Sequence, residues 1–301
     1  MKQVAVVGSL NMDQVINVRE MPQKGETILG LGMSKAPGGK GANQAYAIGK
    51  LGGSVSMIGA VGQDENGKIL KNNLESVGVN TKYVAELPEV PTGNAVIMVD
   101  EAAENSIVVI QGANAELTTA DIDARKEVLQ QSDAVVMQLE IPLEVVEYTA
   151  KMASEMGKTV ILDPAPAVPN LPDTLLAYVD IVKPNETELA TLTGMPVTNA
   201  EEAENAAKTL LKKGIKHVIV TMGENGSMLV TDQRVQRFAS EKVKAVDTTA
   251  AGDSFTAAFV VAVTSGKSYE EAIDYGNRVS AITVTRKGAQ TSIPDKEEVM
   301  L

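Results

Sequence analysis

Short apolar runs alternate with helix-length stretches through most of the 301 residues, and this alternation limits the fold more than any other feature. The apolar runs have the length and composition of strands that are buried on both faces. Parallel strands need crossover helices between them, so the order predicts an α/β fold with a doubly wound, mostly parallel sheet flanked by helices. The predicted strands are 4–7, 55–58, 134–138, 159–162, 181–182 and 218–221, and the predicted helices are about 41–51, 66–77, 143–156, 186–193, 201–213, 252–265 and 269–284.

Two segments break the alternation. Residues 13–36 and 92–110 carry strand-like residues around turn signals, without a helix. We interpret both as insertions that form a small β-sheet lid on a single domain spanning 1–301. The apolar faces of such a lid need a partner, which predicts a homodimer formed through the lid.

The composition excludes several classes of function. A net charge of -12 argues against nucleic acid and anionic membrane as partners, because either needs a basic face. The absence of cysteine excludes disulfides and a cysteine nucleophile. The first residues indicate a buried strand rather than a signal peptide, and no apolar run approaches the ~20 residues of a membrane span. We expect a cytoplasmic protein.

The segment VDTTAAGD (246–253) places a carboxylate at the predicted start of a helix. Ala250, Ala251 and Gly252 are too small to block the first-turn amides, and the positive end of the helix dipole lies there. Such a turn suits a phosphate. Asp253 is placed beside it to accept a proton from a hydroxyl. The combination predicts phosphoryl transfer to an alcohol.

Polar residues also follow the first predicted strand. Asn11 and Asp13 point the same way in an extended chain and could hold neighbouring hydroxyls of a polyol, although ordinary turn chemistry is the alternative. The glycine cluster 38–41 opens a helix, where Lys40 and Asn43 add donors. A flexible loop at a helix start is the alternative interpretation.

Three further strand ends carry candidate groups. Glu140 could accept hydrogen bonds from sugar hydroxyls, or be a solvated acid. Asn185 and Glu188 could organise hydrated Mg²⁺ near nucleotide phosphates, or be a helix cap with an acid that suits the dipole. The glycine turn 221–226 could approach a base or phosphate, or be a common hairpin. In one parallel sheet these strand ends share an edge, so the polar groups should converge there.

The single histidine offers no alternative chemistry. His217 opens an apolar strand, and no GxSxG motif is present to partner it in a hydrolase. A dinucleotide-binding GxGxxG motif is also absent after the first strand, which argues against a nicotinamide dehydrogenase.

Nine motifs, in this order and spacing, carry a family resemblance. They are GSLNMD (8–13), GGKGANQA (38–45), QGANAELT (111–118), MQLE (137–140), LDPAPA (162–167), KPNETE (183–188), TMGENG (221–226), AVDTTAAGDSF (245–255) and VTRKGAQTSIP (284–294). The chain resembles the ribokinase branch of the PfkB carbohydrate kinase family from the first strand to nearly the last residue.

The resemblance implies an ATP-dependent kinase that converts D-ribose to D-ribose 5-phosphate. It implies that Asp253 is the catalytic base and that the amides of Ala250, Ala251 and Gly252 form the anion hole. The residues implied to bind the sugar are Asn11, Asp13, Gly39, Lys40, Gly41, Ala42, Asn43, Glu140 and Asp253; those implied to bind ATP are Asn185, Thr221, Met222, Gly223, Glu224, Asn225, Gly226, Gly252 and Asn277.

The resemblance also implies two cations. Mg²⁺ would accompany ATP and be served by Glu188 through water, and K⁺ would be a monovalent activator. From the residues alone, the segment 286–288 indicates only a basic helix end with a glycine cap. The positions implied for the monovalent cation are Asp247, Thr249, Thr283, Arg286, Gly288 and Ser292, several of them through backbone carbonyls.

Alternatives stay open at this point. A sibling kinase could act on deoxyribose, fructose or a nucleoside, although the Asn11 and Asp13 pair favours vicinal hydroxyls. The chain has 3% aromatic residues and no tryptophan, and so lacks an obvious platform for a nucleobase. A non-catalytic sugar-binding protein is a further alternative, against which the Gly252-Asp253 pair argues.

Overall fold

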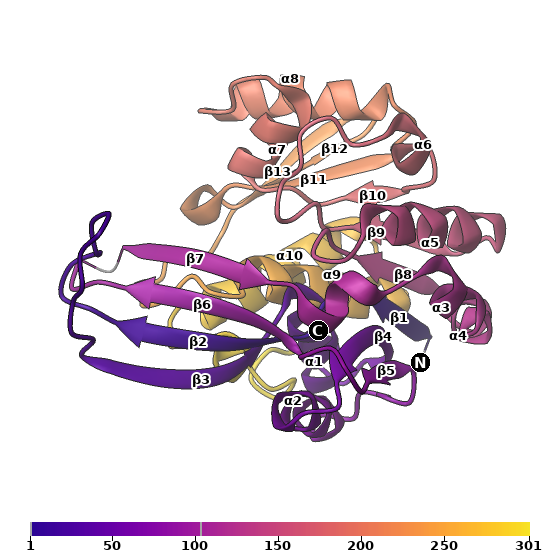
Figure 1. The fold of residues 1–301 in the computed structure, drawn as a ribbon. Helices are drawn as coiled ribbons and strands as arrows, with labels where there is room; N and C mark the ends of the chain where they lie inside the picture. The colour runs from indigo at the N-terminus through magenta and orange to yellow at the C-terminus, as the bar shows by residue number, and fades with distance from the viewer. Residues whose placement is uncertain (1, 103) are drawn as a thin grey trace.

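The structure, a computed structural model, describes residues 2–102 and 104–301. Within these residues a nine-stranded sheet has the order β13-β12-β11-β10-β9-β8-β1-β4-β5. All neighbours from β11 to β5 are parallel, and β12 and β13 are antiparallel additions at one edge (Figure 1). The strands are β1 (Gln3–Val7), β4 (Ser54–Gly62), β5 (Val84–Leu87), β8 (Ala134–Met137), β9 (Thr159–Leu162), β10 (Ile181–Val182), β11 (His217–Thr221), β12 (Ser227–Val230) and β13 (Val235–Phe238).

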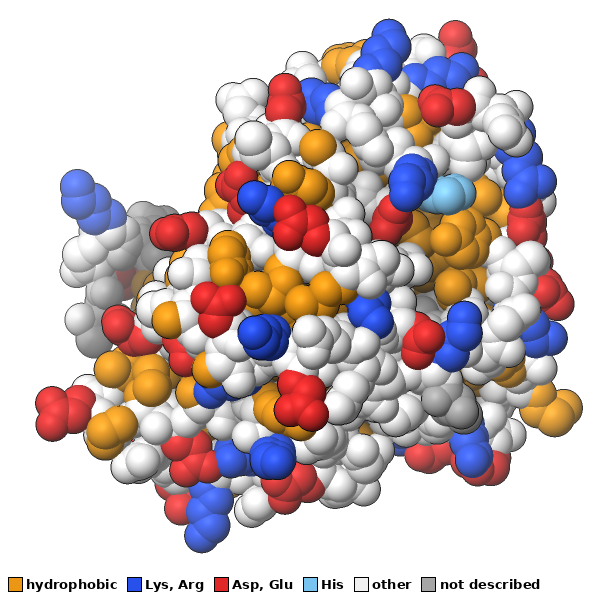
Figure 2. Space-filling model, turned by 90° about the vertical axis from the view of Figure 1, so that its right-hand side faces the viewer, with side chains coloured by type: hydrophobic (Ala, Val, Ile, Leu, Met, Phe, Trp, Pro, Cys, Tyr) orange, Lys and Arg blue, Asp and Glu red, His pale blue; other side chains and the backbone are white. Residues whose placement is uncertain are grey.

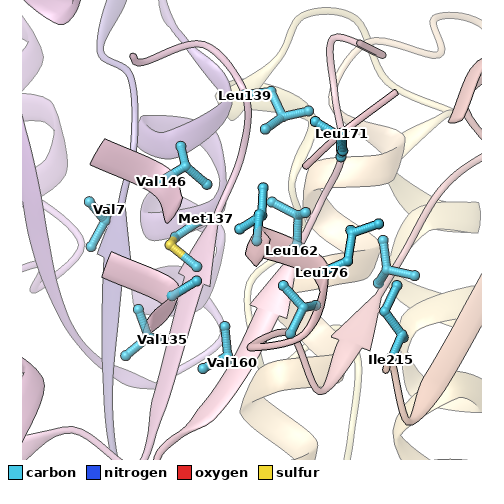
Figure 3. Close-up of a cluster of buried hydrophobic side chains, with 14 of the residues drawn as sticks. Val7, Val135, Met137, Leu139, Val146, Val160, Leu162, Leu171, Leu176 and Ile215 are labelled. Atoms are coloured by element: carbon cyan, nitrogen blue, oxygen red, sulfur yellow. The ribbon is translucent and has the colours of Figure 1, made fainter. Parts of the chain in front are cut away.

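Helices cover both faces of this sheet, which confirms the predicted doubly wound architecture. Successive strand residues point to opposite faces, so Val135 and Met137 enter one core cluster and Ala134 and Val136 enter the other. The first cluster packs under α5 and α8 (Figure 3), and the second under α1, α9 and α10. The α-helices are α1 (Lys40–Lys50), α2 (Glu65–Glu75), α3 (Thr119–Asp123), α4 (Lys126–Gln131), α5 (Leu143–Glu155), α6 (Asp173–Leu176), α7 (Glu186–Thr193), α8 (Ala200–Leu211), α9 (Ala251–Thr264) and α10 (Tyr269–Thr283); the 3₁₀ turns are η1 (Gly112–Glu116), η2 (Gly223–Asn225) and η3 (Gln290–Ser292).

A second sheet of the order β3-β2-β6-β7 projects from the main body (Figure 1). It consists of β2 (Asn11–Asn17), β3 (Gly32–Gly38), β6 (Gly93–Val99) and β7 (Asn105–Ile110), so both predicted insertions contribute to it. The insertions begin or end slightly outside the predicted bounds, since β2 starts at Asn11 and β3 ends at Gly38. The first residue of β2 pairs with the last of β3, which brings the lid to the start of α1.

The strand register fixes where the polar residues after the strands lie. Val7, Met137, Leu162 and Val182 occupy matching positions in four neighbouring strands. The residues that follow each of them therefore emerge at one edge of the sheet, as the sequence predicts.

Several elements differ from the sequence prediction. The strands β5, β12 and β13 and the short helices α3, α4 and α6 were not predicted. Residues 227–230 are too few for a hydrophobic period to distinguish a strand from another kind of buried segment. They form a strand because they pair with β11. Along the described ranges, no helix combines the length and apolar character needed to cross a bilayer.

Candidate active site

The start of α9 has the geometry expected of an anion site. Ala250 adopts a left-handed conformation (φ 60°, ψ 11°) immediately before the helix, an unusual state for a residue with a side chain. The N–H of Ala251 donates to the Thr248 carbonyl (3.2 Å). The N–H groups of Gly252 and Asp253 have no partner within the described part of the chain. Ala251 is therefore already engaged, and among the described residues the open amides of this turn are those of Ala250, Gly252 and Asp253.

The carboxylate of Asp253 is held on both oxygens by amides from α1. Asn43 Nδ2 donates to Oδ2 (3.0 Å), and Gln44 Nε2 donates to Oδ1 (3.0 Å). Asp253 is 6% exposed, so it lies inside the site and does not point into solvent. The helix start that offers open amides thus also presents a fixed carboxylate.

A buried ionic network that the sequence reasoning missed supports this arrangement. Gln44 Nε2 also donates to Asp163 Oδ2 (2.8 Å), and the same oxygen lies 2.9 Å from Lys183 Nζ. Lys183 in turn donates to the Gly252 carbonyl (3.3 Å), and the Thr256 hydroxyl donates to Asp163 (3.2 Å). Asp163 and Lys183 directly follow β9 and β10, so the strand-end rule that identified Glu140 could have found them.

Asn11 and Asp13 lie on the other side of Asp253, on the first strand of the lid. Asn11 Oδ1 accepts a hydrogen bond from Asn114 (2.8 Å), which fixes the Asn11 amide. Burial, with the charges of Glu140 and Asp253, raises the pKa of Asp13 to about 7. No group in the described ranges donates to the Asp13 carboxylate. The carboxylates of Asp13, Glu140 and Asp253 therefore lie close enough to influence one another, and Asp13 has no donor of its own among the described residues.

The glycine cluster allows the lid and α1 to meet closely. Gly39 has φ 87°, and a Cβ there would lie 2.6 Å from the backbone nitrogen of Asn11. A Cβ on Gly38 would overlap the Asp13 carboxylate. Close contact, with backbone at Gly39 and with the Asp13 side chain at Gly38, is the reason for glycine at these positions.

Two of the residues expected to bind the sugar have their N–H groups engaged within the protein. The N–H groups of Gly41 and Ala42 donate to the hydroxyl (3.3 Å) and carbonyl (2.8 Å) of Ser9, and Ala42 lies in the apolar core. Their sugar contacts stay predictions. The Ser9 hydroxyl itself donates to Glu140, which orients that carboxylate.

Lys40 reaches the nucleotide side of the site. Its N–H donates to Glu140 (2.9 Å), and Lys40 also lines a large cavity that reaches Asp253. Burial alone would lower the pKa of Lys40, yet the surrounding carboxylates, Asp253 foremost, outweigh burial and raise it. A lysine that stays charged here suits a polyanion better than a neutral sugar.

This cavity, of about 940 Å³, contains most of the residues expected to bind ATP. Met222 is the exception, because its side chain is buried in the core beneath the turn. Asn277 is held by a hydrogen bond to the Ser227 hydroxyl (3.0 Å). The expected residues that line the cavity are Asn185, Glu188, Thr221, Gly223, Glu224, Asn225, Gly226, Gly252 and Asn277, together with Ala250, Ala251 and Asp253.

Asn185 and Glu188 form a helix cap, which is one of the two interpretations weighed for them. Each side chain accepts a hydrogen bond from the other's backbone N–H (2.8 Å), which is a capping box at the start of α7. Burial raises the pKa of Glu188, although Lys183 opposes the shift. In the described segments, no cluster of three or more histidine, aspartate or glutamate side chains is arranged to hold a metal ion. A cation here would depend on phosphate oxygens as well as Glu188.

The loops around α9 and α10 are joined by Asp247. Its Oδ1 accepts from the N–H (2.9 Å) and hydroxyl (2.6 Å) of Thr249, and its Oδ2 accepts from the N–H of Gly288 (2.9 Å). These hydrogen bonds outweigh burial and lower the pKa of Asp247. Asp247 thus links Thr249 to Gly288, and all three are positions expected for a monovalent cation.

The remaining expected cation positions have their side chains engaged elsewhere. The hydroxyl of Thr283 donates to the Val279 carbonyl, and that of Ser292 donates to the Ala289 carbonyl. The guanidinium of Arg286 pairs with Glu298. Only backbone carbonyls remain for a cation at these three positions.

The single histidine lies far from this site. His217 is the first residue of β11, at the opposite edge of the sheet, and its ring is on the face shown in Figure 2. It packs edge-on against Tyr269 at 4.7 Å between ring centroids. A structural role, as expected, accounts for it.

Comparison with known proteins agrees with the fold. The sequence pattern described as the pfkB family of carbohydrate kinases matches residues 1–296. The chain belongs to this family of sugar kinases.

Individual relatives narrow the comparison. The chain is 42% identical to the ribokinase of Haemophilus influenzae, over 99% of this chain and 97% of that protein. It is 39% identical to the deoxyribokinase of Salmonella typhi, over 98% and 96%. Among solved structures, Arabidopsis thaliana ribokinase complexed with ribose and ATP has a TM-score of 0.92 at 36% identity, over 99% of this chain and 97% of that one. Ribokinase from Thermotoga maritima has a TM-score of 0.91 at 40% identity, over 99% and 98%.

Proposed function

We propose that this protein is an ATP-dependent kinase that phosphorylates D-ribose on its primary 5-hydroxyl and forms D-ribose 5-phosphate and ADP. The observation that carries the proposal is the position of Asp253. Its carboxylate lies near those of Asp13 and Glu140, and the residue belongs to the first turn of α9, where the open amides are. The ribokinase relatives, similar along their whole length, support D-ribose as the sugar.

The sugar side of the site would hold ribose by its hydroxyls. Asp13 and Glu140 supply acceptors, and the free N–H groups of Asn11 and Asn43 supply donors. Vicinal hydroxyls suit this mixture, because each hydroxyl both donates and accepts. The 5-hydroxyl would then lie against Asp253.

The reaction follows from these positions. Asp253 accepts the proton of the 5-hydroxyl while that oxygen bonds to the γ-phosphorus, and the bond from phosphorus to the β-phosphate oxygen breaks to release ADP. The N–H groups of Gly252 and Asp253, which have no partner among the described residues, would stabilise the charge that develops on the transferred group. Lys40 adds positive charge from the cavity wall.

We propose that Mg²⁺ accompanies ATP and that Glu188 serves it through water. Glu188 lines the cavity, and only its Oε2 accepts a hydrogen bond from the described residues. Mg²⁺ neutralises phosphate charge when bound. We propose K⁺ as an activator near the loops that Asp247 joins, held by backbone carbonyls.

We also propose that the lid joins two copies of this chain. All six residues of β7 are exposed, and four of them form the apolar run Ile107, Val108, Val109 and Ile110 at 46 to 56% exposure. Because β7 is an edge strand, its unpaired backbone groups and apolar side chains present a self-complementary surface to an identical lid.

The substrate assignment is tested by ADP release with D-ribose, deoxyribose, fructose and nucleosides at equal concentrations, with and without K⁺. D-ribose should give the highest kcat/KM, and the product should carry phosphate on carbon 5 by NMR. The deoxyribokinase relative makes deoxyribose the second candidate. A higher kcat/KM for any other acceptor would refute the proposal.

A further inference from the structure

Each amide that holds Asp253 is itself held by a glutamine from another part of the chain. Asn43 Oδ1 accepts from Gln290 Nε2 (3.0 Å), and Gln44 Oε1 accepts from Gln138 Nε2 (2.6 Å). All four of these amide side chains are at least nine-tenths buried. Gln290 belongs to η3, near the end of the chain, and contacts α1 across 247 residues of sequence.

The direction of every hydrogen bond in this network follows from the carboxylates. A carboxylate only accepts, so Asn43 and Gln44 must present their NH₂ groups to Asp253. Their carbonyl oxygens then face away and must find donors, which Gln290 and Gln138 supply.

The same logic extends one step further to α2. The carbonyl oxygen of Gln290 accepts from the amide of Asn73. The four groups form a directional amide relay, from Asn73 through Gln290 and Asn43 to Asp253. Reversal of any member would bring two carbonyl oxygens or two NH₂ groups together in a buried place, which is costly.

We propose that Asn73 and Gln290 are positioning residues for phosphoryl transfer, because this relay sets which end of the Asn43 amide faces Asp253. The inference rests on the proposed kinase function, in which Asp253 must align with the sugar hydroxyl. With the Asn43 amide reversed, its carbonyl oxygen repels the carboxylate, and the carboxylate turns away from the hydroxyl. Small misalignments of a reacting group lower the rate strongly.

The sharpest test reverses the polarity at the far end of the relay, where folding is least at risk. Asn73→Asp keeps the size of the side chain but replaces its donor with an acceptor. The new carboxylate attracts the NH₂ group of Gln290, so the Gln290 amide turns over and its carbonyl oxygen faces Asn43. The Asn43 amide then turns over in the same way and presents its carbonyl oxygen to Asp253. Asn72→Asp is the matched control, since Asn72 is the exposed neighbour on the same helix and lies outside the relay.

We expect N73D to lower kcat about threefold to thirtyfold, with the KM for ATP changed less than about twofold. N72D should keep wild-type kcat. Gln290→Glu, one step closer to Asp253, should lower kcat more than Gln290→Ala, because alanine leaves Asn43 free whereas glutamate attracts its NH₂. Equal kcat in N73D and N72D, or a smaller loss in Q290E than in Q290A, would overturn the relay.

A readout without turnover separates this inference from the proposed function. The side-chain ¹⁵N resonances of Asn43 should shift in N73D and stay unchanged in N72D, in protein without substrate. If the wild-type protein does not phosphorylate D-ribose, the proposed function fails while this comparison still judges the relay. An Asn43 resonance that is the same in both variants would refute the relay even in an active kinase.

Discussion

The Nζ atom of Lys183 lies 2.9 Å from Asp163 Oδ2, with both side chains almost wholly buried beneath the start of α9. The same ammonium donates to the Gly252 carbonyl, and Gln44 joins Asp163 to Asp253. One ion pair therefore supports both the open amides and the carboxylate of the site. This dual contact makes the pair a determinant of stability as well as geometry.

Lys183→Met should destabilise the protein strongly, since it leaves Asp163 buried without a counter-charge. Loss of one partner from a buried pair costs about 3–5 kcal/mol. The double variant Lys183→Met/Asp163→Asn, which removes both charges, should recover a large part of that loss. Urea unfolding measures both. Equal stability of the single and double variants would show that the pair is not coupled.

Asp253→Asn should lower kcat by about 10²- to 10⁴-fold, the usual contribution of a general base. Ribose and ATP should still bind by calorimetry, because Asn11, Asp13 and the cavity residues remain. Asp274→Asn is the control, since it removes an exposed carboxylate from α10. Near-normal turnover in D253N would refute the assignment of the base.

The pKa of Asp13, raised to about 7 by burial and by Glu140 and Asp253, predicts a pH-dependent stability. Below the ordinary pKa of 3.8 the carboxyl is neutral in both the folded and unfolded chains, and there is no penalty. As pH rises toward 7 only the unfolded chain releases its proton, so the folded state loses stability. Above 7 the penalty is complete.

The Asp13→Asn variant has no carboxylate at this position, so its folded state does not lose stability as the pH rises. In the absence of substrate it should therefore be more stable than wild type at pH 8, by about 1–3 kcal/mol once solvent screening is allowed for. Urea unfolding at pH 4 and pH 8 measures the difference, which should vanish at the lower pH. If the variant were more stable than wild type by the same amount at pH 4 and at pH 8, the raised pKa of Asp13 would be contradicted.

Gly39→Ala should destabilise the protein and raise the KM for ribose. It combines an unfavourable positive φ with a Cβ placed 2.6 Å from the backbone nitrogen of Asn11. Gly25→Ala is the matched control, with φ 83° and nothing within 4 Å of its Cβ. The control should cost about 1 kcal/mol and leave KM unchanged. Similar KM values in the two variants would show that the close contact is unimportant.

Val108→Asp should dissociate the proposed lid dimer, because it places a charge in the exposed apolar run of β7. Sedimentation velocity would then give one chain for the variant and two for the wild type. Ile69→Asp is the control, since it changes an exposed apolar residue on α2 in the same way. A wild-type protein that sediments as a single chain would refute lid dimerisation.

The sequence alone was sufficient for the fold class and for the main elements that build it. Buried strands and amphipathic helices differ in hydrophobic period, so the six predicted strands and seven predicted helices match observed elements closely. Residues that follow strands, such as Asp13 and Glu140, were identified because parallel strands end at one edge whatever the details of packing, and Asp253 was identified because it lies at a helix start. The family resemblance then predicted what each of these residues does in the reaction.

Only the tertiary structure decided how each polar group is used. That Ala42 packs in the core while its neighbour Asn43 reaches Asp253 depends on how α1 packs on α9, and local pattern does not encode this. Gln44 and Gln290 have ordinary local surroundings in the sequence, and their roles arise from hydrogen bonds between distant segments. Periodicity reports which face of an element is buried, whereas a buried polar group is specified by its partners, and those partners meet only when the chain has folded.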